Sequence, residues 1–178
     1  MRVYVPATLA MLSKLVADRS VSPVNGTAFA VTPALRESYS EGDDDELNEV
    51  ALREAALASV RLLAGAADEG SAPDVAGQAD SAALPVRRAV LVAEVDDVTV
   101  RPDLDDAVVR LSGPVNYDQV VAAYVDNQAA ETAVLAAVDA VDAADLGDED
   151  AELTVGDAQD HDLAWYATQE LPFLLDLL

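Results

Sequence analysis

The spacing of apolar residues over the first 35 positions changes from strand-like to helix-like and back. Residues 2–5 form a short run of β-type residues, and the apolar residues after Thr8 recur at helical spacing. The chain then breaks at Asn25 and Gly26, before a second β-type run at residues 27–32. This order predicts a strand, a helix and a second strand, which together make a βαβ unit.

The same order returns near the C-terminus. Residues 123–126 are typical of a strand, 131–141 of a helix and 163–168 of a second strand. A Thr-x-x-Leu tetrad follows both second strands, starting at Thr32 and at Thr168. The sequence therefore predicts two βαβ units in pseudo-repeat, each with a right-handed crossover.

Between these units the pattern predicts one long helix, a loop and several strands. The long helix covers residues 46–63, which contain neither Pro nor Gly, and Glu49 and Arg53 form a favourable i,i+4 pair on it. Residues 64–84 are rich in Gly, Ala, Ser, Asp and Pro and predict a mobile surface loop. The other predicted elements are strands at 86–95, 98–101, 107–111 and 119–126, a helix at 127–144, an acidic connection at 148–160, a strand at 162–167 and a short helix at 171–177.

These elements predict an α+β fold in one domain, residues 1–178. We expect two βαβ units around a mainly antiparallel sheet with the helices on one face, a ferredoxin-like arrangement with an inserted long helix. One strand has an alternative assignment. Ala122 and Ala123 favour a helix at 119–126, whereas the β-branched residues there favour the strand that we adopt.

The composition shows how the core must be built. Hydrophobic residues make up 52% of the chain and aromatic residues only 4%, so Ala, Val and Leu must form most of the core. We expect five large side chains to anchor it: Tyr4, Phe29, Tyr124, Trp165 and Phe173. If Trp165 is such an anchor, its truncation costs about 3–5 kcal/mol. The chain has no cysteine, which excludes disulfides and thiolate metal sites.

The strong negative charge limits the classes of partner. The chain has a formal net charge of −24 and a pI of about 4.1, and it would repel phosphate backbones and anionic lipids. We therefore expect no nucleic-acid and no membrane partner. No apolar run approaches the ~20 residues of a membrane span, and Pro6 interrupts the position of a signal sequence, which predicts a cytoplasmic protein. A GC-rich genome, with Lys14 as the only lysine, and a need for solubility are alternative explanations of the charge.

Two acidic clusters have oxygen ligands at the close spacing that magnesium or calcium uses. They consist of Asp103, Asp105 and Asp106 and of the acidic residues within 148–152. An EF-hand loop begun at Asp148 fails, because Leu153 stands where Gly is required and Gln159 where Glu is required. Solvated loops are the alternative interpretation of both clusters.

His161 is the only histidine, which excludes zinc sites built from several histidines. Between Asp160 and Asp162 it is a candidate general base, and an ordinary residue at the start of a strand is the alternative. A group of arginines could receive an anion or, as we expect, pair with the surrounding carboxylates. They are Arg87, Arg88, Arg101 and Arg110. The chain has no P-loop, G-x-G-x-x-G, G-x-S-x-G or H-E-x-x-H motif.

Three segments are similar to those of a known protein family. They are MRVYVPAT at residues 1–8, GTAFAVTPALRE at 26–37 and LAWYATQELP at 163–172. In these segments the chain resembles an uncharacterised family of small acidic proteins from high-GC Gram-positive bacteria. The resemblance implies a bacterial cytoplasmic protein and carries no active-site residue.

The sequence leads to three hypotheses for function. The first is a non-catalytic protein that acts through protein contacts, with another protein or a second copy of the chain as its partner and with no cofactor. The second is a small hydrolase or ligand-binding enzyme that uses a divalent cation on Asp103, Asp105 or Asp106. The third is a polyanion mimic that occupies a basic partner. Without a convergent catalytic set, we assign no catalytic, cofactor-binding or metal-binding residue.

Overall fold

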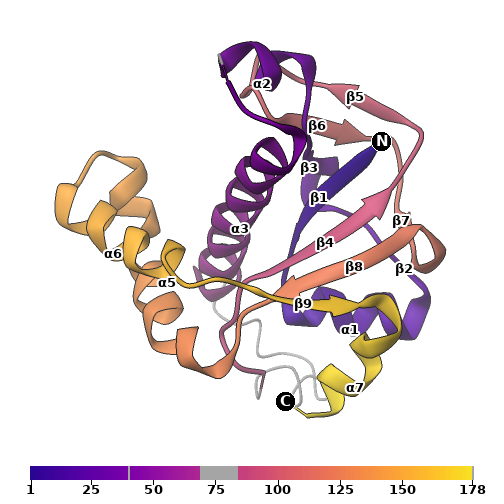
Figure 1. Ribbon diagram of the computed structural model, residues 1–178. Helices are drawn as coiled ribbons and strands as arrows, with labels where there is room; N and C mark the ends of the chain where they lie inside the picture. Colours follow the sequence, from indigo (N-terminus) through magenta and orange to yellow (C-terminus); the bar gives the residue numbers. More distant parts are fainter. Residues whose placement is uncertain (40, 69–83, 178) are drawn as a thin grey trace.

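A computed structural model describes residues 1–39, 41–68 and 84–177, and within them one main sheet has seven strands, all paired antiparallel (Figure 1). The strand order is β5-β6-β3-β1-β4-β8-β9. The strands are β1 (Arg2–Ala7), β3 (Thr27–Phe29), β4 (Ala89–Glu94), β5 (Val98–Val100), β6 (Val108–Leu111), β8 (Val120–Val125) and β9 (Ala164–Ala167). The predicted α+β class with a mainly antiparallel sheet is confirmed, as is the strand assigned to residues 119–126.

Helices cover both faces of this sheet, whereas the sequence predicted one face. They are α1 (Leu9–Asp18), α2 (Pro33–Ser38), α3 (Asp44–Asp68), α5 (Glu131–Asp145), α6 (Glu149–Gln159) and α7 (Leu171–Asp176). Helices α1 and α7 pack on one face, and α2 and α3 pack on the other. The alternation along β1 shows the reason: Val3 and Val5 face α1, Tyr4 faces α3, and all three are buried. A sheet that is apolar on both sides needs a helical layer on each.

The ferredoxin-like pseudo-repeat is not confirmed, because neither predicted unit joins parallel strands. β1 and β3 are antiparallel neighbours, and so are β8 and β9. After α1, the short strand β2 (Ser20–Val21) and a 3-10 turn (Val24–Gly26) lead the chain to β3. This return brings the chain back to the end of the sheet where β1 stopped. The turn needs its glycine: Gly26 has φ +68°, and a Cβ there would lie 2.9 Å from the carbonyl oxygen of Leu111.

The prediction of an acidic connection at residues 148–160 is wrong, because most of this segment forms helix α6. The carboxylate of Asp148 caps this helix by accepting from the amide of Ala151 at 2.9 Å. Ala151, Val155 and Ala158 recur at helical spacing, and all three are buried. Val155 and Ala158 belong to a cluster with residues of α3 and α5, and α6 packs against α5. Two successive helices, in place of the one expected, return the chain to the end of the sheet where β8 stops. This explains why β9 is antiparallel to β8.

Two smaller features of the structure also differ from the predictions. The loop predicted at residues 64–84 starts later, because α3 continues to Asp68; residues 69–83 lie outside the described part of the chain. The short strand β7 (Val115–Asn116), which we did not predict from the sequence, pairs with β2 in a second small sheet. A 3-10 turn follows at Tyr117–Gln119.

None of the helices in the described residues combines the length and apolar character needed to cross a membrane.

Candidate functional site

A buried ion pair joins the start of β4 to the end of β8. Arg88 and Asp126 are 1% and 0% exposed. The guanidinium donates from Nε to Asp126 Oδ2 at 2.9 Å and from Nη2 to Oδ1 at 2.8 Å, and the Arg88 amide also donates to Oδ2 at 2.8 Å. A bidentate pair with this geometry is strong and directional. We did not predict this role of Asp126 from the sequence.

Arg88 also fixes the segment that leads from α6 into β9. Its Nη1 donates to the Gln159 side chain at 3.1 Å, and its Nη2 donates to the backbone carbonyl of His161 at 2.7 Å. One buried guanidinium therefore ties together β4, β8, the end of α6 and the approach to β9. The predicted pairing of arginines with carboxylates is confirmed here. It is also confirmed for Arg87 with Glu131 at 3.1 Å and for Arg101 with Asp103 at 2.8 Å. Arg110 instead donates to the backbone carbonyl of Asn25 at 3.0 Å.

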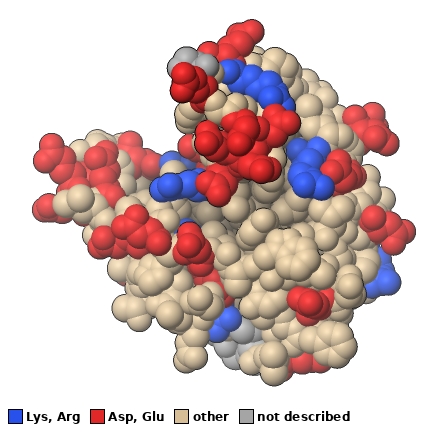
Figure 2. Space-filling model, in the orientation of Figure 1, with Lys and Arg blue, Asp and Glu red and all other residues tan. Residues whose placement is uncertain are grey.

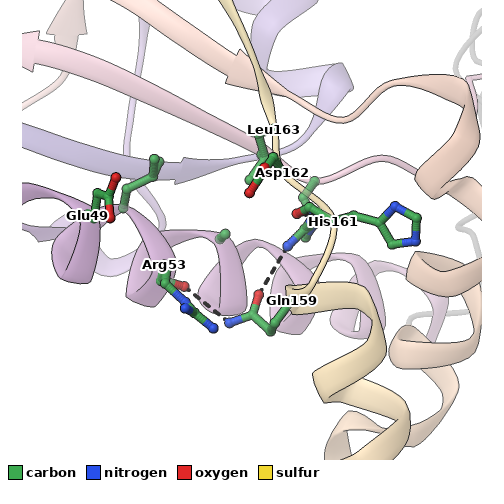
Figure 3. A pocket seen from close by; sticks show the side chains of 9 residues that line it. Glu49, Arg53, Gln159, His161, Asp162 and Leu163 are labelled. Atoms are coloured by element: carbon green, nitrogen blue, oxygen red, sulfur yellow. Dashed lines mark hydrogen bonds between the residues drawn. The ribbon is translucent and has the colours of Figure 1, made fainter.

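A hollow of about 300 Å³ lies above this pair, between α3, the end of α6 and the start of β9 (Figure 3). Glu49, Leu52 and Arg53 of α3 line one side of it, and Asp162 and Leu163 line the other. The predicted i,i+4 pair of Glu49 and Arg53 is not among the ion pairs formed by the described residues. Asp126 neutralises Arg88, so two carboxylates and the guanidinium of Arg53 set the charge of the hollow.

His161 does not assemble into an acid–base site with these groups. Figure 3 shows its imidazole turned away from Glu49 and Arg53. Its contact with Arg88 is made by the backbone carbonyl, and the side chains of Asp160 and Asp162 on either side are exposed. The geometry favours the alternative interpretation of His161 as a residue at the start of a strand.

The candidate cation ligands Asp103, Asp105 and Asp106 have different surroundings. Asp103 accepts from Arg101 at 2.8 and 2.9 Å, which holds the pKa of its carboxyl below the usual value. Asp106 accepts from the hydroxyl of Ser38. In the part of the chain that the structure describes, no three Asp, Glu, His or Cys side chains come together in a way that could hold a metal ion.

Asp105 instead lies close enough to α3 to affect Glu54. Burial raises the pKa of Glu54 above its usual value, and the negative charge of Asp105 raises it further. The folded protein therefore holds this proton up to a higher pH than the unfolded chain does. Ionised Glu54 costs stability at neutral pH, and that cost disappears as the pH falls through the raised pKa towards the reference value of 4.5.

We expect Glu54→Gln to raise the melting temperature at pH 7, with a gain in stability below about 1 kcal/mol. The gain should shrink as the pH approaches the reference value, and melts recorded between pH 4 and 8 will show this trend. Glu152→Gln, at an exposed position on α6, removes the same charge as a control. Equal gains for both variants at every pH would contradict a local effect at Glu54.

β9 is one of the two edge strands of the main sheet (Figure 1). Trp165 is directly opposite Tyr124 of β8 and is 57% exposed, although the sequence predicted a buried anchor. Phe173 is exposed as well, and only Tyr4 and Phe29 of the five expected anchors are buried. The reason is that α3 lies over β1 and β4 and does not extend over β9.

We name this region the β9 surface and define it by four residues on the α3 side of the sheet: Leu52, Tyr124, Leu163 and Trp165. Figure 2 shows a broad area without charged side chains over β8 and β9, while acidic side chains gather over α2, the start of α3 and α6. The hollow lies at one end of the β9 surface, because Leu52 and Leu163 line both.

We expect Trp165→Ala to lower the free energy of unfolding by only about 1 kcal/mol, not by the 3–5 kcal/mol of a buried anchor. More than half of the side chain is already in contact with water, so little apolar area returns to water when it is truncated. Urea unfolding followed by circular dichroism measures this, since the variant has lost the only tryptophan. A loss above 3 kcal/mol would mean that Trp165 is buried in solution.

Two features that we did not predict could have been recognised in the sequence. Arg88 stands directly before the apolar residues of β4, and Asp126 directly follows those of β8. Opposite charges at the ends of two buried strands are candidates for a buried pair whenever those strands are neighbours. The exposure of Trp165 was indicated more weakly, by its place in the last predicted strand, because such a strand can form the edge of a sheet.

Comparison with curated proteins and with solved structures finds no match. Comparison with protein families does find a match, which covers residues 1–175 and therefore nearly the whole chain. The chain belongs to the family described as a family of unknown function, DUF6912.

Proposed function

We propose that this protein is a non-catalytic protein-binding module and that the β9 surface is its binding site. The observation that carries the proposal is Trp165, a tryptophan that is 57% exposed on an edge strand. Residues 163–168 carry no charge in a chain in which 25% of residues are charged. Tryptophan and tyrosine at the centre of an uncharged patch are typical of the residues that dominate binding energy in protein interfaces.

The surroundings of the candidate catalytic groups support a binding role over catalysis. Asp103 and Asp106 accept hydrogen bonds from Arg101 and Ser38, and the imidazole of His161 turns away from Glu49 and Arg53. A cation-dependent hydrolase needs several such ligands on one ion. The hydrolase hypothesis therefore has less support than binding.

The polyanion mimic is a second way to bind a basic partner. It needs carboxylates in rows at the spacing of phosphates, whereas in the view of Figure 2 they gather in separate groups over α2, the start of α3 and α6. In our proposal these groups of carboxylates attract a basic partner by long-range electrostatics, and the β9 surface binds it. The resemblance of the sequence supports the cytoplasm of a high-GC Gram-positive bacterium as the setting.

The test compares three forms of the full chain: the natural protein, Trp165→Ser and Leu146→Ser. Leu146 is 90% exposed between α5 and α6, away from the β9 surface, so its variant controls for the loss of any exposed apolar side chain. Each form captures proteins from native bacterial lysate, and each captured protein is then purified and titrated against all three. We expect a partner that binds the natural protein and Leu146→Ser and that binds Trp165→Ser at least ~10-fold more weakly. Equal binding to all three forms would overturn the proposal.

A further inference from the structure

We propose that the partner binds as an added β-strand along β9 and that it is an extended protein segment carrying arginine or lysine. This inference rests on the proposed binding role of the β9 surface and adds the binding mode and the chemistry of the partner. It follows from the direction of backbone groups, from the lack of edge protection and from the charges around the strand.

The backbone of β9 has hydrogen-bonding groups that face away from the sheet. The amide of Asp126 donates to the carbonyl of Arg88 at 3.1 Å, so even-numbered residues at the end of β8 bond to β4. In an antiparallel ladder these groups alternate in direction, and Val125 and Ala123 therefore bond to β9, at Ala164 and Tyr166. The N–H and C=O groups of Trp165, which lies between these two residues, and the N–H group of Ala167, which follows them, therefore point outward. The carbonyl of Ala167 accepts the first bond of the 3-10 turn Thr168–Glu170.

The two edges of the main sheet differ in protection. At the far edge, β5 has only three residues, and Asp97 precedes it while Arg101 and Pro102 follow it. Charges and proline close to a short strand are the usual means of preventing a further strand from pairing. β9 pairs with β8 without a register shift, and residues 163–168 contain no charge and no proline. β9 is therefore the edge that can accept a strand.

The charges around β9 favour a basic segment. Exposed carboxylates lie on both sides of the strand, Asp160 and Asp162 before it and Glu170 after it. Glu49 lies across the hollow from Asp162, and in the described residues none of these four carboxylates forms an ion pair. A segment pairing with β9 would place apolar side chains against Trp165 and its basic ends near these carboxylates.

A second copy of the chain is a poorer occupant of the same edge. Antiparallel pairing of β9 with β9 would bring Asp160 and Asp162 of each copy towards Glu170 of the other. Two molecules that each carry a net charge of −24 also repel each other at a distance. Charge complementarity therefore selects a basic partner over self-association.

One substitution removes an outward amide without removing a bond to β8. Ala167 has φ −66°, the value that proline imposes, and Tyr166 before it is in a strand, the conformation that a following proline favours. Ala167→Pro should therefore fold normally and block the added strand. Ala167→Val adds a side chain of similar size and keeps the amide, which makes it the matched control.

The probe is a displayed library of random peptides of about twelve residues, selected on the full-length protein. We expect the selected peptides to alternate apolar residues and to carry Arg or Lys at their ends. Synthetic copies should shift the emission of Trp165, the only tryptophan, to shorter wavelength and protect it from acrylamide. Affinity should fall at least ~10-fold on Ala167→Pro, stay within ~3-fold on Ala167→Val, and weaken as salt is added.

Several results would overturn this inference. If selected peptides lose affinity on Trp165→Ser and keep it on Ala167→Pro, the β9 surface binds proteins by another mode, and only the added strand is refuted. Selected peptides without excess basic residues would refute the charge argument. A library without binders, or a dimer in analytical ultracentrifugation that Ala167→Pro dissociates, would refute the basic segment as the occupant.

Discussion

Asp126→Ala is expected to lower the free energy of unfolding by about 3–5 kcal/mol. The substitution leaves the guanidinium of Arg88 buried, at 1% exposure, without its carboxylate. Two guanidinium donors and the Arg88 amide lose their acceptor together. The penalty comes from an uncompensated buried charge, since the net stabilisation by the intact pair is much smaller. Urea unfolding monitored by Trp165 fluorescence and circular dichroism will measure it.

Arg61 and Asp145 provide the matched control, because they form the same bidentate pair at the surface. Their two hydrogen bonds measure 3.0 and 2.9 Å, and the side chains are 46% and 44% exposed. Water and salt screen this pair, so Asp145→Ala should cost less than about 1 kcal/mol. Similar losses for both variants would show that burial does not decide the cost.

A double replacement separates the burial of charge from the loss of packing. Arg88→Met combined with Asp126→Leu removes both charges and fills the space with apolar side chains, so it should recover most of the stability that Asp126→Ala loses. The carbonyl of His161 and the side chain of Gln159 would still lose their donor. If the double variant is as unstable as Asp126→Ala, the uncompensated charge is not the main cost, because both variants also leave the backbone amide of residue 88 without its acceptor.

The sequence predicted most elements of the fold because the local patterns were strong. Thr8 and Thr32 cap helices through their side chains, and β-branched residues outweighed Ala122 and Ala123 in β8. These features depend on neighbours in the chain, which a sequence displays directly. Helix α6 had the required spacing as well, but its acidic residues concealed the three small apolar positions that face α5.

The arrangement of the elements in space was harder to predict. Whether β1 and β3 run parallel depends on how residues 19–26 return the chain, and no periodicity encodes that. The exposure of Trp165 depends on how far α3 extends across the sheet, which is a property of the packed structure. The same limit applies to the candidate site, because Arg88 and Asp126 meet only once β4 and β8 are known to be neighbours.

Removing every residue after Asp160 is expected to give insoluble or molten protein. The deletion removes β9, so β8 becomes an unpaired edge, and it removes α7, whose Leu171 and Leu174 are 0% and 7% exposed in the core beneath α1. The carbonyl of His161, which accepts from Arg88, is lost as well. A core opened to water while the rest of the sheet persists is typical of a molten state.

This deletion is the second large effect, and it tests whether the C-terminal segment belongs to the fold or is only a ligand-like tail. Gel filtration, dye binding to exposed apolar surface and the cooperativity of the circular-dichroism melt report on the state of the truncated chain. Phe173→Ala is the control: this side chain on α7 is 71% exposed, so its loss should leave the melt nearly unchanged. A truncated chain that is soluble, monomeric and cooperatively folded would show that β9 is dispensable. The segment after Asp160 would then be a separable binding tail, and not an edge strand that the sheet and Arg88 hold in place.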